Sequence, residues 1–252
     1  THGNLVANMQ QVRACLAQLG PDGQPLLREG QEVMIAPLPL YHIYAFTANC
    51  MCMMVSGNHN VLITNPRDIA GFIKELKNWR FSALLGLNTL FVALMDHADF
   101  KTLDFSSLKL TNSGGTALVK ATAERWEQIT GCRITEGYGL TETSPVACTN
   151  PYGDQSRLGT VGLPVPGTLL KVINDDGVEQ PMGERGELCI KGPQIMKGYW
   201  HKPEATAEVL DAEGWFKSGD IAVIDPDGFV RIVDRKKDMI IVSGFNVYPN
   251  EI

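Results

Sequence analysis

The chain reads Arg133-Ile-Thr-Glu-Gly-Tyr-Gly-Leu-Thr-Glu-Thr143 at the point where a short apolar strand, residues 133–135, gives way to glycines. In a parallel sheet, ligands bind beyond the carboxyl ends of the strands, and glycines let the backbone approach a ligand closely. Tyr138 offers a flat ring to a base, Thr141 offers a hydroxyl to a phosphate, and Glu142 offers the oxygen ligand that Mg²⁺ prefers. On composition alone, a tight turn with a capping Thr and a solvated Glu fits the stretch equally well.

Around this stretch, residues 1–150 alternate short apolar strands with amphipathic helices. Strands are expected at 61–64, 81–86, 108–111 and 133–135, and helices at 69–76, 90–95 and 118–130. Such repetition predicts an α/β fold with a parallel sheet covered on both faces. The loop Ser113-Gly114-Gly115-Thr116 follows the neighbouring strand, so it should open at the same sheet edge as Gly137, which favours a nucleotide site.

After residue 150 helical patterns nearly vanish and turn dipeptides recur. Short strands are expected at 170–173 and 187–191, and Asp225-Pro-Asp-Gly228 joins strands 221–224 and 229–233 in a hairpin. The second part of the chain, residues 151–234, is therefore predicted to be a small antiparallel sheet or β-barrel subdomain.

Composition excludes several classes of protein. The chain has 252 residues with a formal net charge of −6, which argues against a nucleic-acid binder that works by bulk electrostatics. Its six cysteines form no CxxC pair, a pattern more typical of reduced thiols in a cytoplasmic protein than of a disulfide frame or a zinc site. The chain begins at Thr1 and ends at Ile252 inside what reads as ordered sequence, so we expect a fragment.

Residues 33–66 contain no Asp, Glu, Lys or Arg. A membrane span needs about 20 mostly apolar residues in a row, and Pro37, Pro39, His42 and Asn49 interrupt this segment. Its helical part, residues 40–55, is therefore predicted to be a buried helix and not a membrane helix.

Five motifs in order then resemble the adenylate-forming enzymes: acyl-CoA synthetases, luciferases and peptide-synthetase adenylation domains. The motifs are residues 39–42, 136–143, 186–192 with 198–200, 215–220 and 234–244. The resemblance covers essentially the whole chain and is greatest to bacterial long-chain fatty acid–CoA ligases. It implies that residues 235–252 are a hinge and the first strands of a C-terminal α+β domain, following subdomains at 1–150 and 151–234.

The resemblance implies a ligase in which a carboxylate and ATP form an acyl-adenylate, after which CoA takes the acyl group. Tyr138 would stack on adenine, Glu142 would hold Mg²⁺, and Asp220 would accept bonds from the ribose hydroxyls. Arg235 would donate to the ribose, and Asp234 would be the hinge. The remaining residues assigned by resemblance are Ser113, Gly114, Gly115, Glu136, Gly137, Gly139 and Ile232 around the nucleotide, Thr141 on phosphate, His42 near the substrate carboxylate, and Ser243 and Gly244 on the CoA side.

Two parts of the family pattern are missing. The phosphate loop would precede Thr1, and a lysine that binds the substrate carboxylate would lie well past the hinge. Catalysis depends on charged groups placed around the reacting phosphorus, so the chain as given is expected not to adenylate at a useful rate.

The uncharged segment 33–66, with Tyr44 and Phe46 near His42, would suit the walls of an apolar tunnel and therefore favours a fatty acid as substrate. Core packing also explains those side chains, so an aryl, short-chain or carrier-protein-bound acid stays open. A non-catalytic nucleotide- or lipid-binding module is the alternative of another class. A cytoplasmic location is expected, and peripheral association with the inner membrane and a homodimer stay open.

Overall fold

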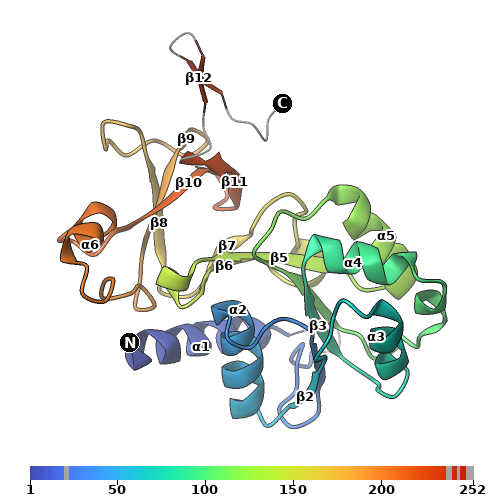
Figure 1. Cartoon of the computed structure of the whole chain (residues 1–252). Helices are drawn as coiled ribbons and strands as arrows, with labels where there is room; N and C mark the ends of the chain where they lie inside the picture. The colour runs from blue at the N-terminus through green and yellow to red at the C-terminus, as the bar shows by residue number, and fades with distance from the viewer. Residues whose placement is uncertain (20–22, 237–239, 243–244, 248–252) are drawn as a thin grey trace.

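The computed structural model describes residues 1–19, 23–236, 240–242 and 245–247, and its larger sheet has seven strands in the order β2-β1-β3-β4-β5-β6-β7 (Figure 1). β1 to β5 pair in parallel, whereas β6 and β7 add antiparallel strands at one edge. The bounds are β1 (Val33–Ala36), β2 (His59–Leu62), β3 (Ala83–Gly86), β4 (Leu110–Ser113), β5 (Ile134–Gly139), β6 (Val146–Thr149) and β7 (Leu163–Pro164).

Helices cover both faces of this sheet, as predicted. Alternate strand residues point to opposite faces, so Ile35 and Leu84 pack with α3, α4 and α5, while Met34 and Leu85 pack with α1 and the π-helix η1 (Figure 1). The helical bounds are α1 (His2–Leu16), α2 (Ile43–Ala45), η1 (Phe46–Met53), α3 (Ile69–Leu76), α4 (Asn88–Asp96), η2 (Ala98–Thr102), α5 (Lys120–Thr130), η3 (Thr141–Thr143), η4 (Gly153–Gln155) and α6 (Pro203–Val209).

The second sheet is antiparallel, with strand order β11-β10-β9-β8. Among the described strands β8 and β11 do not pair, so the structure is an open sheet and not a closed barrel. The larger sheet also continues past residue 150, because β7 is its edge strand. The bounds are β8 (Leu169–Ile173), β9 (Arg185–Lys191), β10 (Phe216–Ile224) and β11 (Val230–Arg235), followed by the antiparallel pair β12 (Ile240–Val242) and β13 (Phe245–Val247).

The uncharged segment differs from the expected buried helix. Its helix begins at Ile43 and becomes π-helical from Phe46 to Met53. Only one side is buried, because Met54 and Val55 are 66% and 54% exposed. In the described part of the chain, no helix has the length and apolar character needed to cross a membrane.

Helix α1 joins the two sheets through a buried polar face. Asn4 Nδ2 donates to the Pro193 and Ile195 carbonyls, each at 2.8 Å, in the loop that follows β9. Asn8 Nδ2 donates to the carbonyl of Val146 in β6 at 2.7 Å, and its Oδ1 accepts from the N–H of the same residue. The amides on α1 therefore fix the second sheet against the edge of the first.

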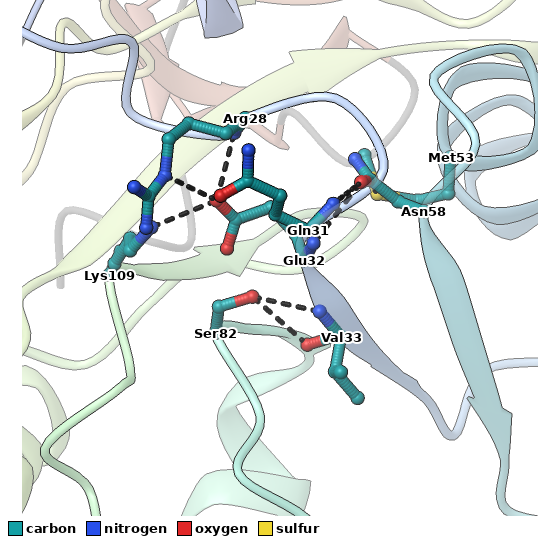
Figure 2. A network of polar contacts seen from close by, with 8 residues as sticks. All are labelled: Arg28, Gln31, Glu32, Val33, Met53, Asn58, Ser82 and Lys109. Carbon is teal, nitrogen blue, oxygen red and sulfur yellow. Dashed lines mark hydrogen bonds and ion pairs between the residues drawn. The ribbon is translucent and has the colours of Figure 1, made fainter.

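The buried carboxylate of Glu32 links the amino ends of several strands, at the edge of the larger sheet opposite Gly139. Glu32, which is 3% exposed, accepts from Lys109 Nζ and from the Arg28 N–H, both at 2.8 Å (Figure 2). Ser82 Oγ accepts from the Val33 N–H at 3.0 Å in the same network. Burial raises the pKa of Glu32, but the hydrogen bonds and charge of its partners outweigh this effect and leave the pKa below its ordinary value.

We expect Lys109→Met to lower the free energy of unfolding by about 3 kcal/mol, because it removes one partner of a buried charge. Lys77→Met is the matched control, since its ion pair with Asp99 lies on the surface and should contribute little. Urea unfolding at neutral pH measures both. Equal effects for the two variants would contradict the prediction.

The pKa of Glu32 also predicts a pH dependence. Because the folded state lowers this pKa, the carboxylate stabilises the fold above its unfolded pKa of about 4.3, and this contribution disappears as pH falls through the folded-state pKa. Glu32→Gln should therefore flatten the decline in unfolding free energy as the solution is acidified below about pH 5. Parallel wild-type and variant curves would contradict this assignment.

Candidate functional site

The quoted stretch lies at the carboxyl edge of the larger sheet, as predicted, but its conformation differs from the expected loop. β5 continues through Gly139 because β6 turns back and pairs with it, with an irregularity between Tyr138 and Gly139. The register pairs Gly137 with Thr149, Tyr138 with Cys148 and Gly139 with Val146. Both glycines of the motif are therefore strand positions that pair with β6.

Close backbone contact explains one of these glycines. A Cβ at Gly139 would lie 2.0 Å from the carbonyl oxygen of Pro145, so no side chain fits there. A Cβ at Gly137 would meet the Cys148 oxygen at 3.4 Å, which is ordinary contact. Gly139 thus holds β5 against the start of β6 and directs residues 140–142 out of the sheet.

Tyr138 and Asp220 join the two sheets at this edge. Tyr138 Oη donates to Asp220 Oδ2 at 2.5 Å, and Arg235 Nε lies 3.5 Å from Asp220 Oδ1. Burial, together with the Asp220 carboxylate, raises the pKa of Tyr138, so its hydroxyl stays protonated and donates. Asp220 faces Arg235 in the register of β10 and β11, which brings three residues predicted from distant motifs into contact.

Glu142 lies in the short helix η3, directly after the motif glycines. Its Oε1 accepts from Tyr199 Oη at 2.8 Å, and its backbone carbonyl accepts from the Met196 N–H at 2.8 Å. Burial and the bond to Glu142 raise the pKa of Tyr199 to about 12. The carboxylate is thus half-buried, with a neutral phenol on one oxygen.

The Ser113–Gly115 loop and Glu136 take different positions. Gly114 and Gly115 line the cavity described below, and Gly115 has a left-handed φ of +80°. Ser113 is buried, and its Oγ has no hydrogen-bond partner among the described residues, but it does not line that cavity. Glu136 also points elsewhere, since its Oε1 accepts from the Gly159 N–H at 3.0 Å. Burial raises the pKa of Glu136.

The remaining predicted residues also fall at or near this edge. His42 caps α2 by accepting the Tyr44 N–H at Nδ1, and both His42 and the exposed Thr141 line the cavity. Asp234 is buried and accepts the Arg235 N–H at 2.7 Å. Ile232 packs in the core of the second sheet. Ser243 and Gly244 lie outside the described residues, and the roles that resemblance gives to all these residues stay predictions.

A single cavity of about 300 Å³ connects the motif to an apolar chamber. Its polar end is formed by residues 137–142, His42 and Arg235. Its other end lies between the sheet and the helices α1 and η1. The apolar lining residues there are Val12, Leu16, Met34, Ala48, Cys52, Met53, Leu85 and Leu110.

Several lining residues carry no local sequence signal. Val12, Cys15 and Leu16 reach the chamber only because α1 packs across the sheet, and Asn112 reaches it because β4 lies beside β5. In the sequence, these lining residues are indicated only by the apolar side of α1. Conversely, Phe46, which was expected to line an acyl tunnel, is 37% exposed and is not part of the lining.

The residues at this edge offer a carboxylate, that of Glu142, as a ligand for Mg²⁺. In the described part of the chain no three His, Cys, Asp or Glu side chains gather around a common point. Mg²⁺ usually takes one or two protein carboxylates and completes its shell with phosphate oxygens and water. Glu142, with one oxygen on Tyr199, can supply such a carboxylate.

With this geometry in place, comparison with known proteins decides the family. The sequence model of a family described as AMP-binding enzyme matches residues 1–200. The chain belongs to this family. Proteins similar to it include the long-chain-fatty-acid–CoA ligases of Escherichia coli O6:H1, 53% identical over 252 residues, and of Haemophilus influenzae, 50% identical over 254 residues. Each match covers 100% of this chain but 44% of the relative.

A comparison with a solved structure supports the same fold. ATP-bound MatB from Rhodopseudomonas palustris superimposes with a TM-score of 0.86 at 30% identity, covering 100% of this chain and 47% of that one. The chain therefore spans less than half the length of the relatives that it matches.

The contacts of Gly139 give a direct test of the motif's backbone. Gly139→Ala should lower the free energy of unfolding by about 3 kcal/mol, because its Cβ would overlap the Pro145 carbonyl. Gly137→Ala, the control two residues away, should change it by less than about 1 kcal/mol. Thermal and urea unfolding of both variants check this, and a well-tolerated Gly139→Ala would show that β5 and β6 do not pair as described.

Proposed function

We propose that the natural protein carrying this chain is an ATP-dependent long-chain fatty acid–CoA ligase. It would convert a fatty acid, ATP and CoA to acyl-CoA, AMP and pyrophosphate. The observation that carries this proposal is the single cavity that joins the Tyr138–Glu142 edge to an apolar chamber. A ligase of this kind needs a nucleotide and an aliphatic chain to meet in one place, and the similarity to long-chain-fatty-acid–CoA ligases supports the same function.

The strands that contribute lining residues show in which direction the chamber extends. Lining residues come from β5, then β4 (Leu110), β3 (Leu85) and β1 (Met34), which are consecutive neighbours in the sheet. Strands lie about 4.8 Å apart, so this floor extends about 14 Å across the strands from β5 to β1. An extended alkyl chain whose carboxylate lies at the motif would run across the strands beneath α1 and η1.

The chemistry proposed for the polar end has two steps. In the first, a carboxylate oxygen of the fatty acid bonds to the α-phosphorus of ATP while the bond from that phosphorus to pyrophosphate breaks. In the second, the CoA sulfur bonds to the acyl carbon, AMP leaves, and the thiol proton passes to solvent. Tyr138, Asp220 and Arg235 would hold the nucleotide, while Thr141 and His42, at the rim, would orient phosphate and carboxylate. Mg²⁺, bound through Glu142, would offset phosphate charge.

The charge distribution of the lining favours an aliphatic acid. Among the described residues that line the cavity, Glu142 is the one acidic side chain, and it lies at the nucleotide end. The chamber itself offers no carboxylate to hold a substrate amine. An acid whose tail is apolar throughout therefore fits better than an amino acid.

The proposal is tested by the substrate range of the natural protein. With ATP, Mg²⁺ and CoA, kcat/KM for palmitate should exceed that for acetate or benzoate by at least roughly a hundredfold, because each buried methylene contributes about 0.8 kcal/mol. Acyl-CoA is measured by mass spectrometry and pyrophosphate by a coupled assay. A preference for an aryl or short-chain acid would show that the proposed substrate class is wrong. Nucleotide binding without turnover would favour a non-catalytic binding module.

The far wall of the chamber predicts a change in chain-length preference. Met34 is 2% exposed and comes from the lining strand farthest from β5, so Met34→Ala should extend the chamber. We expect kcat/KM for an acid two methylenes longer than the preferred one to rise roughly tenfold relative to the preferred acid. Met95→Ala, in the core on the opposite face of the sheet, is the matched control. An unchanged profile in Met34→Ala would place the end of the acyl chain elsewhere.

A further inference from the structure

The loop between β9 and α6 reaches the site through one side chain, Tyr199. We propose that Tyr199 is a positioning residue that fixes the carboxylate of Glu142 for its contact with the Mg²⁺-bound nucleotide. This inference rests on the proposed function, because that function gives Glu142 its ligand. The hydroxyl of Tyr199 acts through Glu142 and is not assigned a contact with substrate.

The loop is built to hold this phenol in place. The Tyr199 N–H donates to Thr206 Oγ1 at 2.9 Å, and Thr206 in turn donates to the Lys202 carbonyl at 2.8 Å. Gly198 has a φ of +140°, and a Cβ there would lie 2.8 Å from Thr206, so the loop can approach α6 this closely only with glycine. Two bonds then reach Glu142, one from the Met196 N–H to its carbonyl and one from Tyr199 Oη to Oε1.

The surroundings of Glu142 explain why such a support is needed. Glu142 lines the cavity that contains Tyr138, and it also lines a second cavity of about 360 Å³ on the side of Tyr199 and Lys217. A flexible carboxylate between two open volumes has several rotamers available to it. The phenol of Tyr199 donates to one oxygen, selects one orientation, and leaves the second oxygen for a cation.

The test is a double-mutant cycle on the natural protein, with affinity for ATP measured by calorimetry as Mg²⁺ is titrated. Tyr199→Phe removes only the hydroxyl and should weaken Mg²⁺-dependent ATP binding roughly tenfold, as expected for a hydrogen bond to a charged group. In a Glu142→Gln background the same substitution should have almost no further effect, because its target has lost its charge. Trp200→Phe is the control: Trp200 is the adjacent residue, 85% exposed and in edge-on contact with the His201 ring.

The outcomes separate positioning from structural support. Equal losses from Tyr199→Phe in both backgrounds, or a loss that Trp200→Phe shares, would overturn the inference and indicate loop stability instead. Wild-type affinity in Tyr199→Phe would overturn it as well. Because binding is measured apart from turnover, a wild-type protein that binds Mg²⁺-ATP but makes no acyl-CoA overturns only the proposed function.

Discussion

The Tyr138 hydroxyl bonded to Asp220 carries the link between the nucleotide motif and the second sheet. One partner comes from β5 in the larger sheet and the other from β10 in the smaller, and the bond is 2.5 Å long. Asp220 also faces Arg235 across β10 and β11. Groups at the proposed site therefore meet only when the two sheets are correctly docked, and a shift of one sheet would separate the motif from its partners.

Docking of the two sheets depends on polar contacts that cannot be recognised from the sequence. Asn4, Asn8 and Gln11 look like the solvent face of a helix, yet all three are buried and bond to backbone carbonyls of other elements. Buried amides with satisfied partners specify one arrangement, because any other leaves them unpaired. On its other side α1 contributes Leu16 to the apolar chamber. The same helix therefore sets the relative position of the sheets and the shape of the chamber.

The sequence predicts features that depend on neighbouring residues better than features that depend on contacts between distant parts of the chain. Helix α3 follows from a local pattern, and Asp68 caps it by accepting the Gly71 N–H. The end of β5 was misplaced because its extension depends on pairing with β6, which the sequence of the motif does not contain. The π-helix η1 was missed since its side-chain pattern resembles an α-helix. Tyr199 belonged to a recognised motif, but only the fold brings it to Glu142.

The arrangement around Gly139 explains how one edge can serve two different chemistries. Because Gly139 allows β5 to touch the Pro145 carbonyl, the chain leaves the sheet there and places Leu140 to Glu142 over the polar end of the cavity. Behind this point the floor of the cavity is made of strand side chains, which are apolar because the sheet is buried on both faces. The charged groups of the cavity lie beyond the strand ends, whereas Met34, Leu85 and Leu110 line it along the strands. The proposed substrate, a carboxylic acid with a long tail, would span that boundary, with its head beyond the strands and its tail along the chamber.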